Sequence, residues 1–138
     1  MSRILLAIST PVAARRLVEP IGDLARRMAA EVLVVHVCRP SAGQIREQEQ
    51  SGGEESLTIL RDELGKREIV VQTLLLFSDD ISRAILTTAN ERQASLIVLG
   101  LTTKNVFARL LAGNVPVELI KSAAVPVLLM PPDWTGVI

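Results

Sequence analysis

Five short runs of apolar residues, separated by longer stretches with a helical pattern, restrict the fold of this chain more than any other feature. Runs of this length are typical of buried strands, and strands that alternate with helices form parallel sheets with right-handed crossovers. The sequence therefore predicts an α/β fold in which an open, five-stranded parallel sheet is doubly wound, with helices on both faces. The predicted strands are Ile4–Ile8, Val32–Cys38, Ile69–Phe77, Leu96–Leu99 and Val127–Met130.

The composition agrees with a sheet of this kind. Apolar residues make up 49% of the 138 residues but aromatic residues only 2%, so Val, Ile, Leu and Ala must fill the core. Such a core is typical of parallel strands covered on both faces. Because the length suits one hydrophobic core and no linker or internal repeat divides the chain, we expect a single domain over residues 1–138.

Charge and cysteine content exclude several classes of protein. Fifteen basic and fifteen acidic residues cancel, so no nucleic-acid partner is expected. The single cysteine cannot form an intrachain disulfide and is typical of a reducing compartment. No apolar run approaches the roughly 20 residues that a membrane span requires, and no signal-peptide core follows Met1. We therefore expect a cytoplasmic protein without membrane insertion.

Capping residues indicate where two helices begin. Thr10 can cap a helix whose first residue is Pro11, a position at which the missing N–H costs nothing. Pro20 lies inside this pattern and is expected to kink or interrupt the helix. Ser78 is expected to cap a later helix, with Asp79 and Asp80 in its first turn.

The segment Arg39–Glu55 is polar and contains three glycines, so it is predicted to be a mobile connection. The spacing of Leu57, Leu60 and Leu64 predicts a helix after it. Gly65 is expected to be the C-cap of this helix.

Two glycines follow the fourth predicted strand and indicate a binding site. Gly100 ends the strand, and Gly113 precedes a helix whose first N–H groups, those of Asn114 and Val115, carry the positive end of the helix dipole. Strand, loop and helix N-terminus in this order are typical of phosphate sites in α/β proteins. Ser9 would face the same crevice if the first strand lies beside the fourth. The alternative is that both glycines only form tight turns.

Other chemically active residues favour structural roles. His36 lies in an apolar run without a second histidine and is interpreted as a core residue bonded to a neighbour. Cys38 is interpreted as a buried thiol, and the pair Asp79 and Asp80 as helix-capping residues rather than as an acid–base pair. Neither a Gly-x-x-x-x-Gly-Lys-Ser/Thr loop nor a Gly-x-Ser-x-Gly elbow occurs. We therefore expect neither an enzyme nor a metal site.

Several of these segments together resemble the universal stress protein family over nearly the whole chain. The segments that carry the resemblance are 4–8, 34–37, 80–89, 96–100, Gly113 and 126–130. The resemblance implies a Rossmann-like fold of the adenine nucleotide alpha hydrolase type. It also implies a binding or signalling module that takes ATP or AMP.

The nucleotide motif of this family is only partly present. Its ATP-binding members share a glycine, two residues, a glycine, nine residues, a glycine and then Ser or Thr. Gly100 and Gly113 match the first and third glycines, whereas Thr103 stands at the second and Asn114 at the hydroxyl position. Ser9 stands where ATP-binding members carry an aspartate that contacts the nucleoside.

Two further positions match the family pattern. Val37 corresponds to the residue that lines the adenine pocket, and Val115 to the backbone donor that follows the third glycine. The resemblance therefore implies a cofactor site formed by Ser9, Val37, Gly100, Gly113, Asn114 and Val115.

The resemblance also implies a homodimer formed through the last strand, residues Val127, Leu128, Leu129 and Met130. An apolar edge of this kind would otherwise be exposed. Because three positions depart from the nucleotide motif, an alternative stays open. In that alternative the chain is an interaction protein with a vestigial crevice and an unknown protein partner, related to the regulatory domains of transporters.

Overall fold

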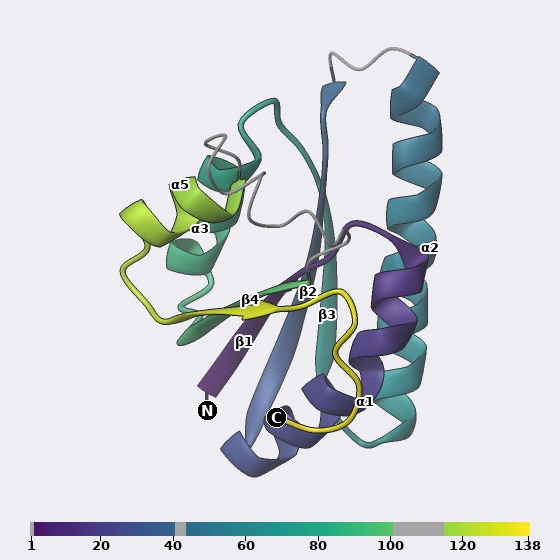
Figure 1. The fold of residues 1–138 in the computed structure, drawn as a ribbon, viewed down its shortest axis with the longest axis vertical. Coiled ribbons are helices and arrows are strands. Elements are labelled where there is room, and N and C mark those ends of the chain that lie inside the picture. The colour runs from purple at the N-terminus through teal and green to yellow at the C-terminus, as the bar shows by residue number, and fades with distance from the viewer. Residues whose placement is uncertain (1, 41–43, 101–114) are drawn as a thin grey trace.

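The computed structural model of this chain describes residues 2–40, 44–100 and 115–138 (Figure 1). Strands and helices alternate along the chain, as the sequence predicts. The strands are β1 (Ser2–Ala7), β2 (Ala30–Cys38), β3 (Val71–Phe77), β4 (Leu96–Gly100) and β5 (Val127–Met130). The helices are α1 (Pro11–Met28), α2 (Gln44–Lys66), α3 (Ile81–Glu91) and α5 (Val115–Ser122).

The five strands form one sheet in the order β3-β2-β1-β4-β5, and every pair of neighbours is parallel. The helices α1 and α2 pack on one face of the sheet, and α3 and α5 pack on the other (Figure 1). The predicted doubly wound fold with helices on both faces is therefore confirmed. The chain changes its winding direction at β1, so that β1 and β4 are neighbours at the switch point.

Alternate residues of each strand enter two separate cores. In β1, Ile4 and Leu6 join the core under α1 and α2, whereas Leu5 joins the core under α3 and α5. All three side chains are fully buried. The middle strand therefore has no polar face, which explains why its sequence is a continuous apolar run instead of an alternating pattern.

Helix α1 begins as predicted, with Thr10 as its N-cap, Pro11 as its first residue and the Thr10 hydroxyl accepting from the Ala13 N–H at 3.2 Å. The expected interruption at Pro20 is wrong, because the helix is continuous over 18 residues. Pro20 is buried beside Ile21, so the contacts of this face offset the backbone hydrogen bond that a proline cannot make.

Helix α2 contains most of the segment that was predicted to be a mobile connection. It begins at Gln44 and runs through Gly52 and Gly53, so the prediction of a connection is wrong for residues 44–55, and residues 41–43 lie outside the described part of the chain. Gly53 is needed for packing, since a Cβ built on it would lie 2.1 Å from Cδ2 of the His36 ring on β2. Close approach of helix to sheet explains why glycine is tolerated here despite its poor helix propensity.

The expected caps at Gly65 and Ser78 are also wrong. Gly65 lies within α2, and the left-handed residue that follows the helix is Glu68, with φ of 62°. The N-cap of α3 is Asp80, whose carboxylate accepts from the Arg83 N–H at 3.1 Å. The Ser78 hydroxyl instead accepts from the Asp80 N–H and so shapes the turn before the helix.

The last strand agrees with the prediction from sequence. Strand β5 has the predicted bounds and lies at an edge of the sheet. Among the described residues, no helix combines the length and the apolar character needed to cross a membrane.

The contact between Gly53 and His36 leads to a prediction about stability. Gly53→Ala should lower the free energy of unfolding by about 1–3 kcal/mol, because the new methyl group overlaps a rigid ring. Gly65→Ala on the same helix is the matched control, since a Cβ there meets nothing within 4 Å. It should leave stability unchanged or raise it by up to about 1 kcal/mol. Equal urea midpoints for the two variants would contradict the packing role of Gly53.

Candidate functional site

The carboxyl edge of the sheet between β1 and β4 is the place where this topology forms a site. Helix α1, which follows β1, and α5, which follows β4 in the described part of the chain, pack on opposite faces of the sheet. In doubly wound sheets such a reversal opens a crevice. Ala7 pairs with Leu99 in the ladder, so Ser9 and Gly100 both lie just beyond its end. Ser9 is exposed. The expectation that these two residues share one edge is thereby confirmed.

Val37 reaches the same edge from β2, on the other side of β1. Ala7 pairs with Val35, so that Val37 lies near the level of Ser9. Its side chain belongs to the core under α3 and α5 and is only 7% exposed. Val37 can therefore offer an apolar wall at the edge, but little of its surface is open.

Gly100 has a packing role that sequence reasoning did not predict. A Cβ on Gly100 would lie 2.7 Å from Cδ1 of Leu17 and 3.2 Å from Cδ1 of Ile8. The absence of a side chain lets α1 pack close to the end of β4. The φ angle of Gly100 is not positive, so this position does not depend on the backbone freedom of glycine.

The structure covers the second half of the predicted site only in part. Val115 is the first residue of α5, as expected for a backbone donor at a helix start. Gly113 and Asn114 lie outside the described residues, as does Thr103. The phosphate-binding role of these positions therefore stays a prediction from sequence.

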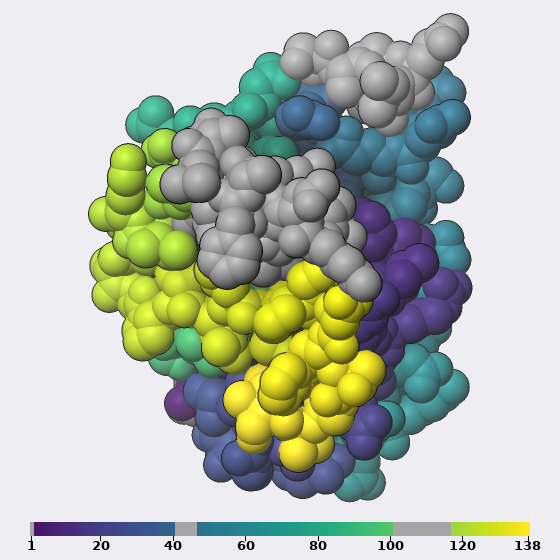
Figure 2. Space-filling model, viewed as in Figure 1, coloured from purple at the N-terminus to yellow at the C-terminus, as the bar shows by residue number. Residues whose placement is uncertain are grey.

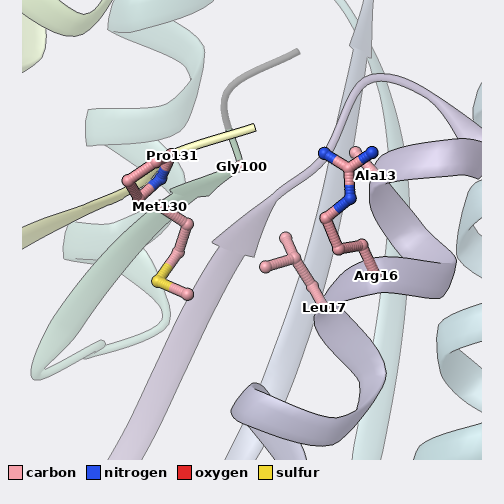
Figure 3. Close-up of a pocket in the computed structure, with 6 residues that line it drawn as sticks. All are labelled: Ala13, Arg16, Leu17, Gly100, Met130 and Pro131. Atoms are coloured by element: carbon pink, nitrogen blue, oxygen red, sulfur yellow. The ribbon is translucent and has the colours of Figure 1, made fainter. Parts of the chain in front are cut away.

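A shallow recess lies on the α1 side of the same edge (Figure 3). Figure 3 shows that α1 contributes one wall and that the ends of β4 and β5 contribute the other. The recess is open to solvent and does not enclose a cavity. The residues that line the recess are Ala13, Arg16, Leu17, Gly100, Met130 and Pro131.

Arg16 is the polar side chain in this recess, and sequence analysis did not single it out. It lies in the middle of a helical pattern beside a second arginine, which is typical of a solvated helix face. Only the position of α1 over the end of β4 brings it to the carboxyl edge. No sequence signal short of the complete fold would have identified it.

His36 anchors the loop that carries Ser9. Its Nδ1 lies 2.8 Å from the Ile8 carbonyl oxygen, and since a carbonyl can only accept, Nδ1 carries the proton and donates. The ring is 2% exposed, and its Nε2 has no hydrogen-bond partner among the described residues. The interpretation of His36 as a core residue bonded to a neighbour is confirmed.

The other chemically active residues do not form a site in the described part of the chain. Cys38 is buried, as expected, and Asp80 is a helix cap. No group of three or more His, Cys, Asp or Glu side chains among the described residues could hold a metal ion.

Comparison with known proteins decides the family. A model of the Universal stress protein family matches residues 1–131. The chain belongs to this family. A comparison with proteins of curated function found no match.

Solved structures of universal stress proteins share the fold. The protein UspA from Lactobacillus plantarum is 18% identical with a TM-score of 0.76, covering 94% of this chain and 97% of its own. A universal stress protein from Archaeoglobus fulgidus in complex with dAMP is 23% identical with a TM-score of 0.71, covering 94% and 97%. A family member from Arabidopsis thaliana with AMP bound is 14% identical with a TM-score of 0.66, covering 96% and 93%. At these identities the likeness establishes the fold alone.

The hydrogen bond of His36 predicts the effect of removing its donor. His36→Leu places an apolar side chain at this buried position but leaves the Ile8 carbonyl without its partner, which should cost about 1–3 kcal/mol of unfolding free energy. His36→Asn retains an N–H two bonds from Cβ and should lose less, despite its smaller volume. Urea unfolding followed by circular dichroism measures both. A greater loss for His36→Asn than for His36→Leu would show that volume, not the hydrogen bond, is decisive.

Proposed function

We propose that this protein is an adenine-nucleotide binding module of the cytoplasm that binds without catalysing a reaction and works as a homodimer. The observation that carries the proposal is the carboxyl edge between β1 and β4, where an exposed Ser9 and Gly100 lie at the switch point of the sheet. Two proteins of the same fold bind dAMP and AMP, which supports a nucleotide as the ligand.

The nucleoside half of the ligand would lie over the ends of β1 and β2. The Ser9 hydroxyl can exchange a hydrogen bond with a ribose hydroxyl, and Val37 can contact the base with the small surface that it exposes. One neutral hydrogen bond contributes about 1 kcal/mol net, less than the charged bond that the family aspartate makes in ATP-binding members. We therefore propose weaker binding than in those members.

The phosphate half would lie beyond the end of β4. The residues that would hold it are Gly100, Gly113 and the N–H groups of Asn114 and Val115. Because Val115 begins α5, its N–H group belongs to a helix N-terminus, where the helix dipole favours an anion.

A second candidate function is supported by the three departures from the nucleotide motif, at Ser9, Thr103 and Asn114. In this candidate the edge is vestigial and the protein acts through contacts with a protein partner, as a relative of transporter-associated regulatory domains. The side chain of Leu17, which fills the space beside Gly100 on the α1 side, is consistent with it.

Calorimetry with AMP and ATP tests the proposal and separates the two candidates. The wild type should bind AMP with a dissociation constant in the micromolar to millimolar range. The variant Ser9→Asp should bind AMP at least about tenfold more tightly, because its carboxylate makes a charge-assisted hydrogen bond to the ribose. Ser51→Asp, exposed on α2, adds the same charge elsewhere and should change nothing. No heat from either nucleotide with any of the three proteins would favour the interaction protein.

The free edge of β5 is the surface that we propose for the dimer. β5 ends the sheet on this side, and its residues Val127, Leu128 and Leu129 are only partly buried. Figure 2 shows the last residues of the chain, in yellow, exposed on the surface between α5 and α1. Trp134 in this segment is 39% exposed, so a second copy that pairs with β5 could also cover apolar surface nearby.

Sedimentation measures the dimer directly. Leu128→Lys places a charge on the proposed interface and should shift a wild-type dimer to monomer. Ile120→Lys is the matched control, because Ile120 is 53% exposed on α5 and lies outside β5. Circular dichroism would confirm that both variants are folded. A wild-type monomer, or a dimer that persists in folded Leu128→Lys, would remove β5 as the interface.

A further inference from the structure

Arg16 is a cation of α1 that has no hydrogen bond or ion pair with another residue in the part of the chain that the structure describes. Among the other arginines of α1, Arg26 likewise has no partner in the described part of the chain, whereas Arg15 and Arg27 form ion pairs. Arg15 contacts Glu55 at 3.1 Å, and Arg27 contacts Asp23 at 2.8 Å. The charge of Arg16 is therefore not neutralised by a described side chain.

The surroundings of Arg16 favour an anion. Three of the other residues that line its recess, Ala13, Leu17 and Met130, are buried and apolar, and no carboxylate is among the lining residues. Figure 3 shows the guanidinium above Leu17, on the side of the carboxyl ends of the strands. An apolar wall lowers the local dielectric constant, which strengthens the attraction between a guanidinium and an anion.

The recess also adjoins the proposed nucleotide edge. Gly100 belongs to both, since it ends β4 at the switch point and lines the recess. An anionic group of a ligand bound over Gly100 would therefore meet a positive charge from the α1 side.

We propose that Arg16 binds the phosphate group of the nucleotide, as a specificity residue that distinguishes nucleotides from nucleosides. This inference rests on the proposed function, which it extends by assigning a side-chain contact to the phosphate. A guanidinium presents its N–H donors in a planar fork that matches two phosphate oxygens, so Arg serves this purpose better than Lys. Because Arg16 is partly exposed, solvent screening limits its contribution to roughly tenfold in affinity.

The experiment compares AMP, adenosine and inorganic phosphate on three proteins, the wild type, Arg16→Gln and Arg26→Gln. Arg26 is an exposed residue of the same helix, about 15 Å further along, and does not line the recess, so its variant controls for net charge. Arg16 has no described partner to lose, and Arg16→Gln should therefore melt at the wild-type temperature. Dissociation constants come from calorimetry at low and high salt.

The expected result has three parts. Wild type and Arg26→Gln bind AMP roughly tenfold more tightly than adenosine, whereas Arg16→Gln binds both alike. The affinity for adenosine is the same in all three proteins. High salt reduces the preference for AMP in the wild type and has little effect in Arg16→Gln.

The other outcomes separate this inference from the proposed function. If the wild type binds AMP and Arg16→Gln binds it equally well, the role of Arg16 is refuted and the nucleotide module stands. If no protein binds AMP, adenosine or phosphate, both are refuted. If the wild type binds inorganic phosphate but not adenosine, and Arg16→Gln loses that binding, Arg16 is an anion site and the nucleotide function is refuted.

Discussion

The parallel pairing of β1 with β2 on one side and with β4 on the other is the interaction on which the rest of this structure depends. The central strand is buried on both faces, so its residues can only be apolar, and both cores are built around it. The same pairing produces the switch point, since α1 after β1 and α5 after β4 pack on opposite faces of the sheet. The candidate site is therefore a result of the strand order, before any particular side chain is considered.

The helices also depend on close contact with the sheet, and glycine residues permit this contact at two positions. Gly100 lets α1 approach the end of β4, and Gly53 lets α2 approach the His36 ring. His36 in turn holds the Ile8 carbonyl, so the position of α2 is connected through one ring to the loop that carries Ser9. Packing on the α1 and α2 face and the geometry of the site edge are thus parts of the same arrangement.

The fold could be predicted from the sequence because its signals are local. Apolar runs and their alternation with helical segments require only neighbouring residues, and β5 has the predicted bounds. The prediction for Arg39–Glu55 was wrong because glycines were interpreted by their intrinsic preference, whereas contacts with a distant strand decide the outcome.

The candidate site could be predicted only in outline, for the same reason. Ser9 and Gly100 were placed correctly at one edge, because the ends of predicted strands in a parallel sheet meet there. The contact of Gly100 with Leu17 and the place of Arg16 in the recess depend on how a helix lies over the sheet. No local pattern contains that information, and the spacing of Gly100 and Gly113 did not reveal the packing role of Gly100.

The contact between His36 and Gly53 has a consequence for how this sequence can change over time. The His36 ring occupies the space that a side chain at position 53 would need. A side chain at 53 therefore requires a smaller residue at 36, and a larger residue at 53 can fill the void that a smaller residue at 36 leaves. A protein in which only one of the two positions has changed is therefore poorly packed. The two positions should therefore vary together among relatives, and a relative with alanine or serine at the position of Gly53 should lack the imidazole at the position of His36.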